Sequence, residues 1–269
     1  MEKIKQAIER AKQQAPDIPA ARSQSEAHPP QTAEIGQVNY DKTKVITLNA
    51  EHLERNRIVS YNKNSPMGWA FDLLRTQVLQ KMDENGWRTL GITSPTPEAG
   101  KTVVAINLAM SIAHHTTKTA MLVDFDLRRP RIGAYLGLPM EKSLNNLLAG
   151  EAELQDILVN PALPRLVILP TKKPVSHSSE VLSSPKVGAL IAELRERYAS
   201  RIVIFDLPPL LSTDDAIAVL PKIDCLLMVV ANGMCTKQEI EESLHHLPEA
   251  TLIGTVLNKA EAEPRAYYY

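Results

Sequence analysis

Apolar and polar positions follow two different periods between about residues 65 and 260. Short apolar runs are typical of strands buried on both faces, and six occur: 89–94 (TLGITS), 119–125 (TAMLVDF), 165–170 (RLVILP), 201–207 (RIVIFDL), 225–231 (CLLMVVA) and 251–258 (TLIGTVLN). Segments between several of them have a helical period: 102–115, 186–198 and 236–247. This alternation predicts an α/β fold with a mostly parallel central sheet flanked by helices, which binds ligands at the carboxyl ends of its strands.

The region before this pattern has a different composition. Residues 1–14 place Ile and Ala on one stripe, which predicts an amphipathic helix. Residues 15–60 are rich in Pro, Ser, Gln, Ala and Asn, which indicates a linker. The predicted organisation is therefore helix, linker, a domain at 65–260 and a tyrosine-rich tail at 261–269.

Composition and charge exclude several classes of protein. The net charge of −1 gives no general electrostatic case for binding nucleic acid or an anionic membrane. The two cysteines, Cys225 and Cys235, do not form a disulfide framework, which favours a reducing, cytoplasmic setting. No apolar run approaches the roughly 20 residues of a membrane-spanning helix, so we expect any association with the inner face of the membrane to depend on a partner.

The segment SPTPEAGKT, residues 94–102, resembles the phosphate-binding loop G-x-x-x-x-G-K-[ST], with Pro95 in place of the first glycine. A predicted strand precedes it and a predicted helix follows it, so its amides lie where a helix N-terminus favours an anion. Lys101 is placed to reach the β and γ phosphates of ATP, and the Thr102 hydroxyl to hold Mg²⁺. The candidate nucleotide-binding residues of this loop are Glu98, Ala99, Gly100, Lys101, Thr102 and Val103.

Acidic residues follow two other predicted strands. LVDFDLRRP places Asp124 and Asp126 at the end of one strand, and IVIFDLPP places Asp206 at the end of another. Carboxylates at such positions face the ligand crevice, where they hold a metal or accept a hydroxyl proton. Three such motifs in this order predict a nucleotide site rather than chance surface charges.

These motifs are similar to the Walker A, A′ and B motifs of the bacterial tyrosine kinases (BY-kinases), which control polysaccharide synthesis and export. The likeness runs from about residue 66 to the end and includes SSEVLSSPKVGALIAELRERY, STDDAIAVL and GTVLNK. It implies a P-loop NTPase fold of the MinD/ParA type, ATP and Mg²⁺ as cofactors, and a membrane-bound activator or polysaccharide co-polymerase as partner. It also implies assembly with further copies of the chain and trans-phosphorylation.

The resemblance implies a role for each motif residue. Lys101 and Thr102 would bind phosphates and metal, Asp124 would be the candidate base, and Asp126 and Asp206 would support Mg²⁺. Asn258 in VLNK would lie near the adenine. Tyr267, Tyr268 and Tyr269, in the terminal AYYY, are similar to the C-terminal tyrosine cluster that neighbouring subunits phosphorylate.

One departure concerns the E-x-x-R-x-x-R helix used in ring assembly, where this chain has Trp69, Asp72 and Arg75, so that only Arg75 matches. Two alternatives to an autokinase stay open. The first is a positioning ATPase of the MinD/ParA type. Proteins of that class have a lysine early in the phosphate-binding loop, and Thr96 at the matching position here argues against this alternative. The second is a non-catalytic nucleotide-sensing module of an export complex.

Overall fold

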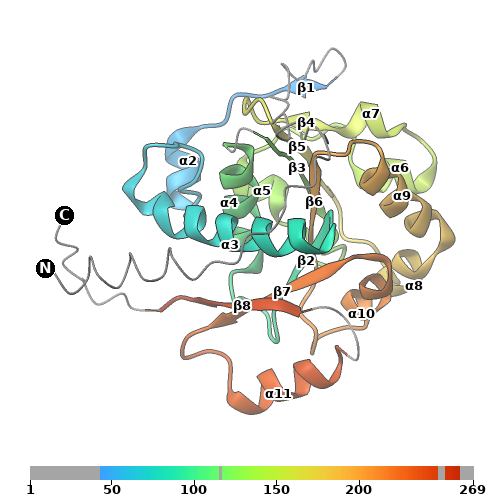
Figure 1. Cartoon of the computed structure of the whole chain (residues 1–269). Coiled ribbons are helices and arrows are strands. Elements are labelled where there is room, and N and C mark those ends of the chain that lie inside the picture. Colours follow the sequence, from blue (N-terminus) through green and yellow to red (C-terminus); the bar gives the residue numbers. More distant parts are fainter. Residues whose placement is uncertain (1–42, 115–116, 248–251, 261–269) are drawn as a thin grey trace, which may run out of the picture. The chain divides into compact units, whose positions relative to one another are not determined.

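The structure is a computed structural model that describes residues 43–114, 117–247 and 252–260 of the 269-residue chain. The predicted helix at 1–14, the first part of the predicted linker and the tyrosine-rich tail lie outside the described residues. The described part forms an eight-stranded sheet with helices on both faces (Figure 1).

The strands are β1 (Lys44–Val45), β2 (Thr89–Thr93), β3 (Thr119–Asp124), β4 (Val159–Asn160), β5 (Leu166–Leu169), β6 (Arg201–Asp206), β7 (Cys225–Ala231) and β8 (Leu252–Asn258). The α-helices are α2 (Ala50–Arg55), α3 (Trp69–Asn85), α4 (Lys101–Ala113), α5 (Ile132–Leu136), α6 (Leu144–Ala149), α7 (Leu154–Ile157), α8 (Ser178–Ser183), α9 (Pro185–Glu196), α10 (Asp215–Val219) and α11 (Lys237–His245). Two 3₁₀ helices are η1 (Pro66–Gly68) and η2 (Leu220–Lys222).

The strand order is β1-β4-β5-β3-β6-β2-β7-β8, and every pairing is parallel except that of β4 with β5. The predicted mostly parallel α/β sheet is therefore confirmed, and each of the six predicted strands is present. The central strands are buried on both faces, which explains why their sequences read as continuous apolar runs. In this order the carboxyl ends of β2, β3 and β6 are neighbours, which brings the three predicted motifs together.

Two apolar layers hold the helices against the sheet. Side chains of α2, α3, α4 and α5 pack on one face, and side chains of α6 to α11 pack on the other. Successive strand residues belong to opposite layers, as the pleat requires: Leu122 and Ile204 face α4, whereas Val123 and Phe205 face the second layer. Because helices pack on both faces of the sheet, the residues at the ends of its strands have fixed positions.

The predicted linker extends too far, because its last residues belong to the folded domain. Strand β1 pairs with β4, and Leu48, Leu53 and Ile58 are buried in the layer with α4. Three buried apolar side chains in a polar sequence attach this segment to the core, although they show no clear period and most of its other residues are exposed or half-buried. The domain therefore includes residues 44–60, ahead of the predicted boundary at residue 65.

Candidate active site

The phosphate-binding loop joins β2 to α4, as predicted. Gly100 adopts φ +90°, a left-handed conformation that glycine tolerates. A Cβ atom at this position would come within 2.2 Å of Nδ2 of Asn258, whose amide donates a hydrogen bond to the Ala99 carbonyl at 2.8 Å. The glycine is thus required for two reasons, its backbone conformation and the close approach of Asn258. The end of β8 is thereby fixed against the loop.

Lys101 and Thr102 contact the acidic residues from the other motifs. The Lys101 Nζ lies 2.7 Å from Oδ2 of Asp126 and 3.4 Å from Oδ1 of Asp206. The Thr102 hydroxyl donates a hydrogen bond of 2.7 Å to Oδ2 of Asp206. All four residues are buried, with no more than 8% of any exposed. The structure thus joins the predicted lysine, hydroxyl and two carboxylates into one cluster.

Asp124 lies beside Asp206, because the two residues are register partners on β3 and β6. Its Oδ2 accepts hydrogen bonds from the backbone N–H groups of Arg131 and Ile132 at 3.1 and 3.0 Å. Its Oδ1 is buried and has no hydrogen-bond partner among the described residues. Burial, together with the negative charge of Asp206, raises the pKa of Asp124 well above its usual range.

The charges of this cluster are strongly coupled. Burial raises the pKa of Asp206, although Lys101 and the Thr102 hydroxyl oppose that rise. Burial alone would lower the pKa of Lys101, but the carboxylates of Asp206 and Asp126 outweigh this effect and raise it. The lysine therefore stays an ammonium ion, held ready among carboxylates for an anionic ligand.

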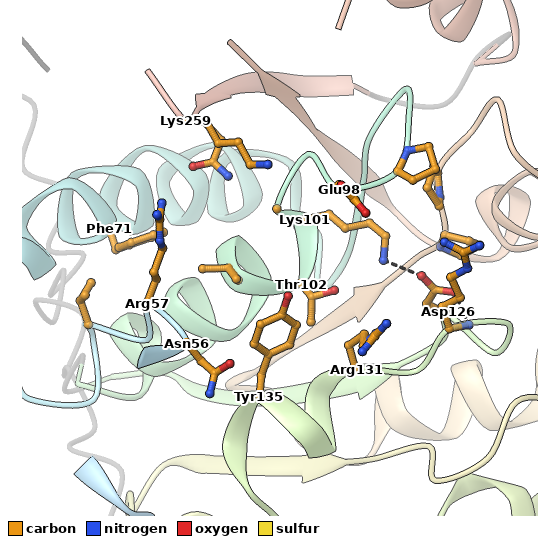
Figure 2. Close-up of a pocket in the computed structure, with 18 of the residues that line it drawn as sticks. Asn56, Arg57, Phe71, Glu98, Lys101, Thr102, Asp126, Arg131, Tyr135 and Lys259 are labelled. Carbon is orange, nitrogen blue, oxygen red and sulfur yellow. Dashed lines mark hydrogen bonds and ion pairs between the residues drawn. The ribbon is translucent and has the colours of Figure 1, made fainter. Parts of the chain in front are cut away.

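A cavity of about 1390 Å³ opens above this cluster. Figure 2 shows Lys101, Thr102, Asp126, Arg131 and Tyr135 around it, with the Lys101–Asp126 ion pair drawn as a dashed line. Of the predicted residues, those that line the cavity are Glu98, Gly100, Lys101, Thr102, Val103, Asp126 and Asn258. Asp124, Asp206 and Ala99 do not belong to its lining and lie buried. Its volume is larger than the range usual for small-molecule sites.

Several lining residues were not predicted from the sequence: Asn56, Arg57, Phe71, Arg128, Arg129, Arg131, Tyr135 and Lys259. Arg128 and Arg129 directly follow Asp126, so their place in that motif was a usable signal. Asn56 and Arg57 come from the segment taken as linker. Asn107 of α4 fixes that segment, because its side chain donates to the Arg57 carbonyl and accepts from the N–H groups of Val59 and Ser60.

The donors present suit Mg²⁺ bound together with a substrate. No group of three or more His, Cys, Asp or Glu able to hold a metal ion by itself occurs among the described residues. Mg²⁺ sites of nucleotide enzymes usually combine one or two carboxylates with phosphate oxygens and water. The hydroxyl of Thr102 and the carboxylates of Asp206 and Asp126 supply hard oxygen donors of this kind, so the residues fit the ion.

The helix that departs from the assembly motif is α3. Its Asp72 and Arg75 form an ion pair of 2.7 Å, and the Arg75 guanidinium also donates to the Ser111 carbonyl at 3.2 Å. Trp69 is 57% exposed at the start of this helix. Arg75, the one matching residue of the motif, is thus directed toward α4 of its own chain.

Comparisons with known proteins show to which family this chain is similar. The chain is 31% identical over 198 residues to the putative tyrosine-protein kinase EpsB of Ralstonia nicotianae, which covers 73% of this chain and 26% of EpsB. The chain therefore spans about a quarter of the length of that relative. The kinase domain of the Escherichia coli tyrosine kinase ETK is 25% identical with a TM-score of 0.70, covering 90% of this chain and 99% of that chain. Both confirm the resemblance predicted from the three motifs.

A more distant likeness concerns the fold alone. The septum site-determining protein MinD of Pyrococcus horikoshii, in complex with Mg-ADP, has a TM-score of 0.54 and 21% identity. The match covers 65% of this chain and 72% of that chain. No protein-family model matches the sequence. Within the described residues, no helix has the length and apolar character needed to cross a membrane.

Proposed function

We propose that this homologue of the bacterial tyrosine kinases transfers the terminal phosphoryl group of ATP to tyrosine hydroxyls. One observation carries the proposal: Lys101, Thr102, Asp126 and Asp206, from three separate motifs, are joined by hydrogen bonds and ion pairs. The first three line one cavity, and Asp206 lies buried beneath them. Phosphoryl transfer depends mainly on positioning and neutralisation of charge, which is what such a cluster supplies.

Residues from the three motifs would have separate roles in binding the nucleotide and the metal. The amides of Glu98 to Val103 cradle the phosphates, and the Lys101 ammonium neutralises the β and γ oxygens. Thr102 and Asp206 would hold Mg²⁺, which neutralises charge on the phosphates when bound. Asn258, fixed against the loop at Ala99, would contact the adenine end of the nucleotide.

The proton of the tyrosine hydroxyl has to pass to a carboxylate. Asp124 was predicted for this role, but it is 0% exposed, does not line the cavity, and accepts two backbone hydrogen bonds. Asp126 is the acid of the three strand ends that lines the cavity. We therefore assign the proton to Asp126 and infer that Asp124 shapes the loop at Arg131 and Ile132.

The acceptors that we propose are Tyr267, Tyr268 and Tyr269, which lie outside the described residues. We propose that a neighbouring copy of the chain phosphorylates them, that a membrane-bound partner activates the reaction at the inner face of the membrane, and that the reaction regulates polysaccharide synthesis or export. The names and homology of the relatives support these proposals. The altered assembly helix predicts a weaker ring than in the family.

The test is incubation of the full chain with Mg²⁺ and labelled ATP, followed by mass spectrometry of the C-terminal peptide. We expect phosphate on the terminal tyrosines. A variant in which all three are changed to Phe should still bind ATP but lose the label, whereas Tyr198→Phe, an exposed tyrosine on the domain, should keep it. Absence of phosphotyrosine, together with ATP hydrolysis and nucleotide-dependent dimers, would replace the proposal with a positioning ATPase.

A further inference from the structure

Arg128 lies at the edge of the cavity, four residues beyond the end of β3. Its side chain is 48% exposed and lines the cavity, yet its Nε donates to the Ser178 hydroxyl at 3.0 Å and lies 3.4 Å from Oδ1 of Asp215. The backbone beside it is also fixed, because the carbonyl of the buried Leu127 accepts a hydrogen bond from Val175. The guanidinium is thus held at its Nε, and its terminal N–H groups form no hydrogen bond or ion pair with the described residues.

Asp215 is unusual because it is completely buried and neither carboxylate oxygen has a hydrogen-bond partner among the described residues. Within the described part of the chain, its side chain forms an ion pair with Arg128. A buried carboxylate without hydrogen bonds costs stability, so such a group calls for an explanation beyond packing. Asp215 lies in STDDAIAVL and Ser178 in SSEVLSSPK, so two segments far apart in the sequence both contact Arg128.

The position of Arg128 along the sheet indicates what it would meet. Asn258, at the proposed adenine end, is the last residue of β8, and Arg128 follows β3, with β6, β2 and β7 between these two strands. Four strand spacings separate β8 from β3, or roughly 19 Å at about 4.8 Å each. The phosphate-binding loop follows β2, so Arg128 lies beyond the loop, on the side away from the adenine.

We propose that Arg128 contacts the phosphoryl group while it is transferred, and that Asp215 and Ser178 are positioning residues that aim its guanidinium. In this step the bond from the γ phosphorus to the bridging oxygen breaks, and its electron pair stays on ADP. The tyrosine oxygen forms the new bond to phosphorus, and its proton passes to Asp126. Arginine neutralises the charge on the equatorial oxygens in such a transfer. The inference rests on the proposed function.

The experiment compares the full wild-type chain with R128Q, R128K, D215N and the double variant R128Q/D215N. R197Q is the matched control, because Arg197 pairs with Glu193 on the surface of the second helical layer and does not line the cavity. Two quantities are measured: tyrosine phosphorylation at saturating Mg·ATP, and the affinity for Mg·ADP with and without aluminium fluoride, which mimics the phosphoryl group in transfer. The second needs no tyrosine acceptor.

We expect aluminium fluoride to tighten ADP binding to the wild type and to R197Q but not to R128Q. Phosphorylation by R128Q should fall about 100- to 1000-fold, the usual effect of removing one group that stabilises transition-state charge. R128K, which keeps the charge but loses the planar fork, should recover part of this loss. D215N should lose part of the fluoride effect, and the double variant should be no worse than R128Q, because Asp215 acts through Arg128.

Unchanged tightening by aluminium fluoride in R128Q would overturn the inference and leave the proposed function intact. Additive losses in the double variant would overturn the positioning role of Asp215. A wild-type chain that binds neither ADP nor its fluoride complex would overturn the proposed function, and the inference with it.

Discussion

The base of the cavity and its opposite wall are built in different ways. At the base, Asp206 ends β6, Asp126 follows β3, and Lys101 and Thr102 begin α4 directly after the loop from β2. All four residues are buried and are joined by ion pairs and a hydrogen bond. In the wall, Asn56 to Val59 form a loop after α2, Arg57 is exposed, and the segment is fixed from behind by Asn107. The base depends on strand register, whereas the wall depends on the Asn107 amide together with the buried side chains of Leu53 and Ile58.

This difference shows that the fold holds the reacting groups and the wall around the cavity mouth by different means. Reacting groups need fixed positions, and a central sheet buried on both faces supplies them. A wall that lies over the mouth of a large cavity can be attached through a few hydrogen bonds, provided that the side chain making them is well buried.

The largest effect should follow Lys101→Met at the base. The substitution removes the ammonium group that lies between Asp126 and Asp206 and that we expect to neutralise the phosphates. Phosphorylation should fall by at least about 100- to 1000-fold. The measurement is the initial rate of tyrosine phosphorylation with labelled ATP.

Lys118→Met is the matched control, because Lys118 pairs with Asp83 and does not line the cavity. Its phosphorylation rate should stay near that of the wild type. Near-normal phosphorylation by the Lys101→Met variant would show that the cluster of Lys101, Asp126 and Asp206 is not needed for phosphoryl transfer.

Asn107→Ala should detach the wall from α4. The amide makes four hydrogen bonds, to Arg57, Val59, Ser60 and Val103. Its loss should lower the free energy of unfolding by about 2 to 3 kcal/mol, because buried backbone groups lose their partners. It should also weaken ATP binding, whereas the hydrogen bonds of the base stay intact.

Urea unfolding and calorimetric titration with ATP measure these two effects. The control is Asn145→Ala, since Asn145 also binds the backbone of a distant segment, at Lys172 and Lys173, but away from the cavity lining. It should leave ATP affinity unchanged. If Asn107→Ala did so as well, the wall would have no part in binding.

Asp124→Asn tests how the buried charge of Asp124, beside the cluster beneath the cavity, affects the pH dependence of the free energy of unfolding. The folded protein binds a proton on Asp124 more tightly than the unfolded chain, since its pKa is raised by burial and by Asp206. The stability that Asp124 contributes is therefore complete below the pKa of an unfolded aspartate, near about 4, and lost as pH rises through the raised folded pKa. Asparagine avoids this loss, so the variant should gain stability relative to wild type as pH rises from 4 to 7.

The gain should reach about 1 to 3 kcal/mol, the usual cost of a buried polar group without a partner. Urea unfolding at several pH values measures it. Asp214→Asn, at an exposed residue with no capping hydrogen bond from its side chain, should show no such trend. A flat difference between Asp124→Asn and wild type would mean that Asp124 is not strained by burial.

The smallest effect distinguishes the two cysteines. Burial, with the charge of Asp224, raises the pKa of Cys225 to about 12, so its thiol is inert at pH 8. Cys235 is half-buried, and its sulfur lies 3.4 Å from the Thr96 hydroxyl in the phosphate-binding loop. Iodoacetamide should modify Cys235 and spare Cys225, and Mg·ATP should slow the modification severalfold.

Peptide mass spectrometry over a time course checks both parts. Modification of Cys225 in the native chain would contradict its place in the core. Equal rates at Cys235 with and without Mg·ATP would show that the loop near Thr96 does not respond to nucleotide.

Local sequence predicted the base of the site better than the wall. The G-K-T motif and the aspartates after two apolar strands are short-range signals. Apolar runs of this kind predict parallel strands, whose carboxyl ends lie at the same edge of the sheet. Strands β1 and β4 have two residues each, too few to show any period, and exist because a neighbour pairs with them. The Asn107 amide and the Arg57 carbonyl are 50 residues apart in sequence, a contact that no local pattern encodes.

By itself, the sequence determined the parallel α/β class, the loop that would receive phosphates and the acids that accompany it, because apolar period and motif spacing act over a few residues. Tertiary structure alone decided that Asp126 lines the cavity while Asp124 lies beneath it, that residues 44 to 60 belong to the domain, and that two distant segments hold Arg128. The physical reason is that burial and register depend on which strands and helices become neighbours. Only the folded sheet fixes those neighbours.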